Sequence, residues 1–197
     1  MMKTRNIGLI SVLMLLGSTM VHADTWTLNP EQSKLNFISI KKVNIAEVHS
    51  FHKLSGQLSD DGTFKVSIDL SSVDTGVDIR DSRMKEFLFN VVEFPKAVLS
   101  SKIDSKVINS MHSGETKILS VEAELDLHGL SKTLPIDVMV TKVSEDELLV
   151  SSSHPIILNV GDFKLDAGVD KLKELAGLSD ISHAVPVSFY ITLNATK

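Results

Sequence analysis

Alternation of hydrophobic and polar residues at every second position is the feature that most constrains how this chain can fold. Runs of this kind cover residues 64–70, 119–127, 136–140 and 185–193. Because successive side chains of a β-strand point to opposite faces, each run predicts a strand with one hydrophobic and one polar face. Weaker strands are predicted to start at Trp26 and Leu35, with others near Phe51, Val98 and Leu148.

These one-sided strands predict an all-β fold. They favour an antiparallel barrel or sandwich over a parallel α/β sheet, and alternation alone does not choose between the first two. Turn signals at 60–62 and at His128-Gly129 separate the strands. Two segments predict short α-helices, residues 80–89 and residues 167–176, and we expect Asp166 to cap the second helix and Gly177 to end it.

The N-terminal residues 1–23 are typical of a cleavable secretory signal peptide. Lys3 and Arg5 precede a short hydrophobic run at 7–16, and Val21-His22-Ala23 supplies a cleavage site of the small-x-small kind. The hydrophobic run is too short to span a bilayer. We therefore expect a single domain over residues 24–197, a periplasmic location, and no stable membrane insertion after the signal is removed.

The composition narrows the classes of function. The 197 residues include 25 acidic and 20 basic side chains, a formal net charge of −5 at pH 7, and only 5% aromatic residues. Nucleic-acid binding needs a basic surface and stacking platforms for bases, so no nucleic-acid partner is expected. The absence of cysteine excludes disulfides, iron–sulfur clusters and thiol catalysis.

Motifs for catalysis and metal binding are nearly absent from the sequence. The chain lacks the serine-hydrolase elbow, the zinc-protease helix and the glycine-rich nucleotide loops. Zinc usually takes at least three ligands, so His49 and His52 could form a site only with His112, His128, His154 or His183. A solvated loop or strand edge is the preferred interpretation of both histidines. A polar turn is likewise preferred over a cation site at Asp60 and Asp61. No catalytic residue, metal or required cofactor is predicted.

Charged residues crowd the approach to the first predicted helix: Asp74, Asp78, Arg80, Asp81 and Arg83. The preferred interpretation is that charge pairing or capping holds this helix across the sheet. Acid–base catalysis by Asp74 or Asp81 is the alternative, and it lacks a partner of known role.

Short motifs follow one another in a fixed order along the chain. They are Trp26-x-Leu28-x-Pro30-x-x-Ser33-x-Leu35-x-Phe37, Leu54-Ser55-Gly56-x-Leu58, Val66-x-Ile68-x-Leu70-x-Ser72-Val73-Asp74-Thr75-Gly76 with Arg80-Asp81, Leu88-Phe89-Asn90-Val91-x-x-Phe94-Pro95, Leu125-x-Leu127-His128-Gly129-x-Ser131-Lys132, and Val185-Pro186-Val187-x-Phe189. In this order the set resembles the YceI-like family of exported bacterial proteins, over nearly all of the mature chain.

The resemblance implies a lipocalin-like antiparallel β-barrel of about eight strands with one or two short α-helices. It further implies that the apolar interior holds a long isoprenoid, either a polyprenyl lipid or an isoprenoid quinone. The expected function is non-enzymatic binding for transport, storage or stress protection, and the resemblance suggests a homodimer. A barrel of eight strands can hold one small ligand if its interior side chains leave space.

Hydrophobic residues that face inward are the candidate ligand contacts. They are Phe37, Phe51, Ile68, Leu70, Phe89, Phe94, Leu125, Leu127, Val138, Phe189 and Ile191. A filled barrel with a structural or protein-interaction role would show the same alternation and is the first alternative. An enzyme for a small apolar substrate, using Asp74, Asp81 or His128 as acid–base groups, is the second.

Three positions depart from the family pattern. His49 and Ala123 stand where glycine is common, and Leu88 replaces a phenylalanine. Glycine in a strand often permits a bend or a close approach to a ligand, so these changes bear on the shape of the cavity.

Overall fold

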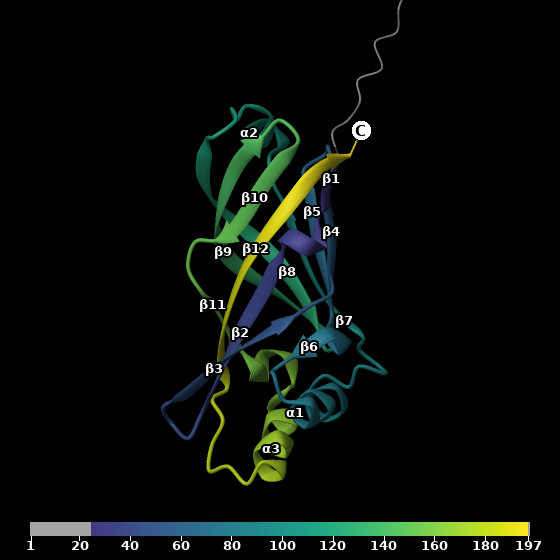
Figure 1. Ribbon diagram of the computed structural model, residues 1–197, viewed down its shortest axis with the longest axis vertical. Helices are drawn as coiled ribbons and strands as arrows, with labels where there is room; N and C mark the ends of the chain where they lie inside the picture. The colour runs from purple at the N-terminus through teal and green to yellow at the C-terminus, as the bar shows by residue number, and fades with distance from the viewer. Residues whose placement is uncertain (1–24, 197) are drawn as a thin grey trace, which may run out of the picture.

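The computed structural model describes residues 25–196, and strands dominate them (Figure 1). Eight antiparallel strands close into a barrel, because β1 pairs with both β4 and β12. In their order around the barrel they are β1 (Thr25–Leu28), β4 (Leu54–Leu58), β5 (Thr63–Asp69), β7 (Lys96–Lys102), β8 (Thr116–Leu127), β9 (Leu130–Ser144), β10 (Glu147–Ser152) and β12 (Ala184–Thr196). The prediction of an antiparallel eight-stranded barrel is confirmed, whereas the predicted signal peptide lies outside the described residues.

The long strand β12 runs through both ends of the barrel (Figure 1). Its C-terminal part pairs with β1 and β10, and its N-terminal part pairs with two further strands, β2 (Lys34–Lys41) and β11 (Ile156–Asn159). β2 forms a hairpin with β3 (Ile45–Phe51). β3 in turn pairs with the two-residue strand β6 (Val73–Asp74), only at Ser50 and Phe51. Within residues 25–196 the sheet therefore ends at the short strand β6, and most of the outer edge of β3 has no strand beside it.

Short helices cover one end of the barrel (Figure 1). α1 (Asp78–Arg83) continues directly into a π-helical turn, η3 (Met84–Leu88), and η3 packs against α3 (Asp166–Leu175). α2 (Ser105–Asn109) lies at the opposite end. Single 3₁₀ turns complete the set: η1 (Pro30–Gln32), η2 (Leu70–Ser72) and η4 (Val160–Phe163). Within residues 25–196 no helix is both long enough and hydrophobic enough to cross a membrane.

Both predicted segments are helical, with corrections to each. The first begins at Asp78 and is α-helical only as far as Arg83, because the π-helical turn η3 forms its second half. Gly177 adopts φ +61° just after α3, as the prediction of a glycine terminator requires. The prediction that Asp166 caps α3 is wrong, because Leu165 occupies the N-cap position. Asp166 lies in the first turn, and its carboxylate is 3.1 Å from Nδ1 of His183.

The turn at His128-Gly129 joins β8 to β9 as predicted. His128 and Gly129 have φ of 53° and 74°, the left-handed pair that a two-residue hairpin favours. A Cβ atom at Gly129 would lie 2.9 Å from the ring of Phe94. Glycine is therefore required here by both the backbone and the neighbouring ring.

The end of the barrel that holds β1 and α2 is filled by side chains. Val140, Leu148 and Leu193 point inward there and have no exposed surface. Only a void of about 20 Å³ is left among these side chains. The end that carries α1 and α3 is different, because its side chains do not fill the space between the strands and the helices.

Candidate ligand-binding site

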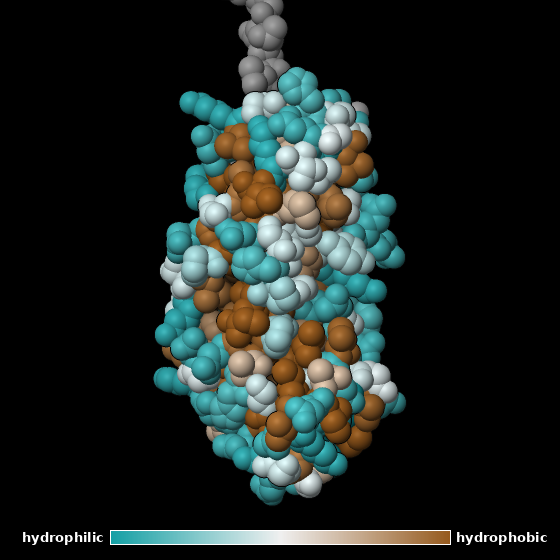
Figure 2. Space-filling view, turned by 90° about the vertical axis from the view of Figure 1, so that its left-hand side faces the viewer, coloured by the Kyte–Doolittle hydropathy of each residue, from teal (hydrophilic) through white to brown (hydrophobic). Residues whose placement is uncertain are grey.

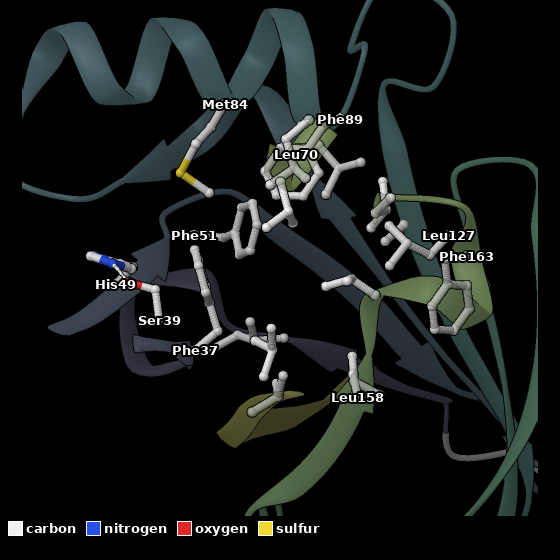
Figure 3. Close-up of a pocket in the computed structure, with 18 of the residues that line it drawn as sticks. Phe37, Ser39, His49, Phe51, Leu70, Met84, Phe89, Leu127, Leu158 and Phe163 are labelled. Carbon is white, nitrogen blue, oxygen red and sulfur yellow. Dashed lines mark hydrogen bonds between the residues drawn. The ribbon is translucent and has the colours of Figure 1, made fainter. Parts of the chain in front are cut away.

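A cavity of about 460 Å³ occupies the helix-bearing end of the barrel. This volume lies in the range of small-molecule binding sites. Side chains from the strands, from η4 and from the helices line it, and most are hydrophobic, as the rings of Phe37, Phe51, Phe89 and Phe163 illustrate (Figure 3). The cavity is closed toward the packed end by Leu99, Ile136 and Phe189, which contact both the cavity and the small void.

The cavity reaches the solvent beside α1. Val77 and Ile79 line the cavity and yet are 44% and 59% exposed. Further exposed hydrophobic residues occur nearby on the β2–β3 hairpin, among them Val43 and Val48. Figure 2 shows several hydrophobic patches close to this end of the molecule. The cavity is therefore open to solvent on the side of α1 that carries Val77 and Ile79.

The lining changes from hydrophobic to polar along β2 and β3. Phe37, Ser39 and Lys41 lie on the inner face of β2, opposite the inner residues Glu47, His49 and Phe51 of β3. Both strands therefore carry an aromatic residue deep in the barrel and a charged residue near the hairpin tip. Glu47 forms ion pairs with Lys41 at 2.7 Å and with Arg80 of α1 at 2.8 Å. The hydrogen bond from Lys41 is the main cause that lowers the pKa of the Glu47 carboxyl.

His49 is the polar residue that lies deepest at this end, with 3% of its surface exposed. Its Nε2 atom is 2.8 Å from Oγ of Ser39, and its ring centre is 5.2 Å from that of Phe37 (Figure 3). Burial, followed by the positive charge of Arg80, lowers the pKa of His49 below its usual value of about 6.5. The imidazole is therefore neutral at pH 7.

Hydrogen bonds that involve three charged side chains hold α1 beside the cavity. Arg80 donates to the carbonyl oxygen of Thr75 at 2.6 Å. Asp81 accepts from the backbone N–H of Thr75 at 2.9 Å and from its hydroxyl. Arg83 donates to the carbonyl oxygen of Leu175 at the end of α3. The prediction that this charged cluster positions the helix is thus supported by each of these contacts.

Comparison with known proteins identifies the family. The family model described as the YceI-like domain matches residues 26–193. The chain belongs to the YceI-like family.

Solved structures agree with this assignment to the YceI-like family. A polyisoprenoid binding domain from Saccharophagus degradans, implicated in plant cell wall breakdown, is 34% identical with a TM-score of 0.86, over 87% of this chain and 98% of that one. BcnA of Burkholderia cenocepacia is 19% identical with a TM-score of 0.66, covering 84% of this chain and 98% of that one. The YceI protein of Campylobacter jejuni is 19% identical with a TM-score of 0.53, covering 80% and 90%. The latter two show likeness of fold alone. No match was found among curated proteins.

Most of the inward-facing residues nominated from the YceI-like sequence meet at this cavity. Those that line it are Phe37, Phe51, Ile68, Leu70, Phe89, Leu125, Leu127, Phe189 and Ile191. Two lie elsewhere. Val138 lines the small void in the packed end. Phe94 is in the loop after η3, where its ring packs on His128 at 4.5 Å and on Gly129, so it helps to hold the β8–β9 turn.

The residues that the sequence offered as metal ligands lie in other surroundings. Among residues 25–196 no three His, Asp or Glu side chains gather as metal ligands. His52 is exposed and pairs with Asp74 at 2.7 Å, as a surface residue would. The expectation of a solvated His49 is wrong, because β3 turns its side chain into the barrel. Asp61 lies in a polar turn, and its hydrogen bond from Lys102 is the main cause that lowers its pKa to about 2.

Several residues of the site escaped the sequence analysis. The polar inner positions Ser39, Lys41 and Glu47 break the hydrophobic alternation of their strands, so a period-two search passes over them. Leu172 of α3 and Met84 of η3 line the cavity from helices, which strand periodicity cannot reveal. The one available signal was the presence of His49 at a position where relatives often have glycine.

Proposed function

We propose that this chain is an exported, non-enzymatic binding protein that holds the tail of an isoprenoid lipid or quinone inside its barrel. The observation that carries the proposal is the largely hydrophobic cavity of about 460 Å³, open beside α1. Support comes from the polyisoprenoid binding domain from Saccharophagus degradans, which shares 34% of its residues with this chain. Transport, storage or stress protection would all use the same binding step.

The physical basis of binding is the hydrophobic effect. Burial of apolar surface contributes about 25 cal/mol per Å² removed from water, without a requirement for polar contacts. A prenyl tail offers continuous apolar surface, and the aromatic and aliphatic lining can accept it at many equivalent positions. A tail longer than the cavity would extend through the opening beside α1.

The two alternatives fit the site less well. A filled structural barrel would lack this cavity, and only the β1 end of the barrel is filled in that way. An enzyme would need its acid–base groups at the cavity, but Asp74, Asp81 and His128 are all outside the lining. Asp74 pairs with His52 at the surface, and Nδ1 of His128 donates to the carbonyl oxygen of Phe163.

Native mass spectrometry of the chain expressed with its N-terminal segment, followed by organic extraction, tests the proposal. We expect a mature mass that begins at Asp24, recovered from the periplasm, together with an adduct that extracts as a prenyl lipid. The same spectrum reports whether the protein is a homodimer. A cytoplasmic, uncleaved chain would contradict export, and a bare protein that also refuses added prenyl lipids would contradict binding.

A pair of neighbouring substitutions on β7 then tests the position of the ligand. Ala97 is buried and lines the cavity, whereas Val98 points to the opposite side of the strand. We expect Ala97→Phe to fill part of the cavity and reduce the retained lipid by about tenfold, a loss of about 1.4 kcal/mol in affinity. Val98→Phe is the matched control and should retain the lipid. Equal retention by both variants would place the ligand elsewhere.

A further inference from the structure

Exposed hydrophobic side chains gather on two short segments beside the cavity, the β2–β3 hairpin and the start of α1. Val43 and Ile45 of the hairpin are 73% and 44% exposed, and Val77 and Ile79 are also exposed. These four residues, named here the hydrophobic rim, are a third of the twelve large hydrophobic side chains that are exposed within residues 25–196. Exposed hydrophobic residues are ordinarily scattered singly, so a group of this kind indicates an interaction surface.

An ion pair joins the two segments of the rim. Glu47 of β3 contacts Arg80 of α1 at 2.8 Å, and both residues line the cavity. Ile45 lies on the same face of β3 as Glu47, one position closer to the tip on that face, because alternate residues of a strand share a face. Val77 and Ile79 flank Arg80 in the sequence and line the cavity themselves. The rim therefore adjoins the cavity opening.

The tip of the hairpin presents Val43 in an unfavourable backbone conformation. Lys42 and Val43 have φ of 48° and 67°, in the left-handed region that a β-branched residue rarely adopts. Asp180 holds this turn, since its carbonyl oxygen accepts from the N–H of Lys42 and its carboxylate accepts from the N–H of Val43 at 3.0 Å. Asparagine or glycine would fit the same turn with less strain. Packing does not account for a strained valine that is largely exposed, so a surface role is indicated.

The charges of the two segments allow approach to a membrane. Residues 41–48 and 77–83 together contain four basic and three acidic side chains, whereas the whole chain has 20 basic and 25 acidic ones. The rim thus lies on a slightly basic part of an acidic protein, and an anionic bilayer would not repel it. Hydrophobic side chains beside basic ones are typical of a surface that lies in a bilayer interface.

We propose that the hydrophobic rim docks on the surface of a phospholipid bilayer, with Val43 and Ile45 entering the interface and the cavity opening toward the lipid. This inference rests on the proposed function and adds the place where the ligand is exchanged. An isoprenoid that passes directly between bilayer and cavity keeps its apolar tail out of water. Few side chains enter the interface, so the docking is peripheral and reversible.

Flotation with vesicles of phosphatidylethanolamine and phosphatidylglycerol, free of isoprenoid lipid, tests the docking. The protein is recovered from cells that express the full chain, so all variants share the same N-terminus. We expect Val43→Asn combined with Ile45→Asn to lower the vesicle partition coefficient about tenfold, because two hydrophobic side chains no longer leave water. If this variant does not fold, Val43→Asn alone should lower the coefficient about threefold, and asparagine tolerates the left-handed turn.

Ile118→Asn combined with Val143→Asn is the matched control. Both residues are exposed and of the same types, and they lie on the outer face of the barrel near its packed end, where Lys117 of β8 pairs with Val140 of β9. Their replacement should leave the partition coefficient within about twofold. The coefficient of the unmodified protein should also stay within about twofold in about 0.5 M sodium chloride, because salt screens charges and not hydrophobic insertion.

A second measurement separates docking from ligand binding. Neither Val43 nor Ile45 lines the cavity, so the affinity for ubiquinone-4, a quinone with a tail of four isoprene units, should be the same in all variants. Native mass spectrometry of the delipidated protein gives this affinity. Failure to bind ubiquinone-4 or any other prenyl lipid would overturn the proposed function, whatever the flotation result.

Four results would overturn the docking alone. They are the absence of vesicle binding by a protein that retains prenyl lipid, an equal loss of vesicle binding in the rim variant and the control, the release of the protein from vesicles by salt, and a change from dimer to monomer in the rim variant with unaltered flotation. The third result would indicate electrostatic adsorption, and the fourth would assign the rim to a contact with a second copy of the chain.

Discussion

At the scale of single residues, Asp81 is the main anchor of α1. One of its carboxylate oxygens accepts hydrogen bonds from both the backbone N–H and the hydroxyl of Thr75, and Thr75 is buried. Removal of the acceptor leaves these two donors unsatisfied. We therefore expect Asp81→Ala to lower the free energy of unfolding by about 1–3 kcal/mol, measured by urea denaturation.

Asp78→Ala is the matched control for this measurement. Asp78 belongs to the same helix, is exposed, and its carboxylate has no hydrogen bond or ion pair in the described part of the chain. Its replacement should change the free energy of unfolding by no more than about 0.5 kcal/mol. Similar losses in both variants would show that helix charge, rather than the contact with Thr75, is what Asp81 contributes.

The positions of some single residues could be predicted from the sequence, and those of others could not. Inner hydrophobic positions such as Leu70 and Leu125 were predictable, because alternation reports which face a side chain occupies. The burial of His49 was not, because a histidine on the inner face is indistinguishable in the sequence from one at a strand edge. The place of Phe94 was missed for a related reason: it follows a helix and precedes a proline, where no period applies.

At the scale of elements, the contact between α3 and η3 depends on Gly168. A Cβ atom there would lie 2.7 Å from the carbonyl oxygen of Phe87 and 2.8 Å from Cα of Leu88. These are backbone atoms, so the helices would have to move apart. Gly168→Ala should therefore destabilise the protein by about 1–3 kcal/mol, as overpacking does, measured as the free energy of unfolding.

Helix propensity predicts the opposite sign for this substitution. Alanine is better than glycine inside a helix by about 0.5–1 kcal/mol, so propensity alone would make Gly168→Ala more stable. A stabilised variant would show that the two helices can separate without loss. The sign of the change thus decides whether close packing fixes this wall of the cavity.

The length of an element decides whether the sequence reveals it. β8 and β9 are long enough for several hydrophobic repeats, and both were predicted together with the turn between them. β6 has two residues, β11 four and α2 five, and none of them was predicted, because a period over so few positions is a weak signal. They form because neighbouring strands and loops hold them in place.

At the scale of the whole molecule, one end of the barrel is packed and the other is hollow. We expect slow hydrogen exchange of backbone amides in the packed end and faster exchange around the cavity in the delipidated protein. Ubiquinone-4 at about a hundred times its dissociation constant should contribute about 2.7 kcal/mol and raise the melting temperature by about 5–10 °C.

The location of the added protection is the informative part of this experiment. Protection should appear in β2, β3, α1 and α3, which surround the cavity, and not around Leu148 and Leu193 in the packed end. Uniform protection over the whole barrel would contradict a ligand confined to the hollow end. An unchanged exchange pattern with a raised melting temperature would indicate binding outside the cavity.

The division into a packed and a hollow end could not be predicted from the sequence. Inward-facing residues alternate equally in both ends, as Val138 in one and Leu127 in the other show. Alternation reports direction, whereas a cavity depends on the distance between facing walls. At the helix-bearing end, β2, β3 and the helices extend the wall beyond the closed barrel (Figure 1), and the cavity of about 460 Å³ lies there.

The outer edge of β3 has a consequence for the behaviour of the protein at high concentration. An uncovered strand offers its backbone N–H and C=O groups to any extended chain, which is how folded domains aggregate edge to edge. Beyond its contact with β6, this edge has no strand beside it in the part of the chain that the structure describes. An inward-pointing charge on an edge strand is one of the features that discourage such growth, and Glu47 provides it. The carboxylate that balances Arg80 beside the cavity thus also helps to keep each molecule separate from its neighbours.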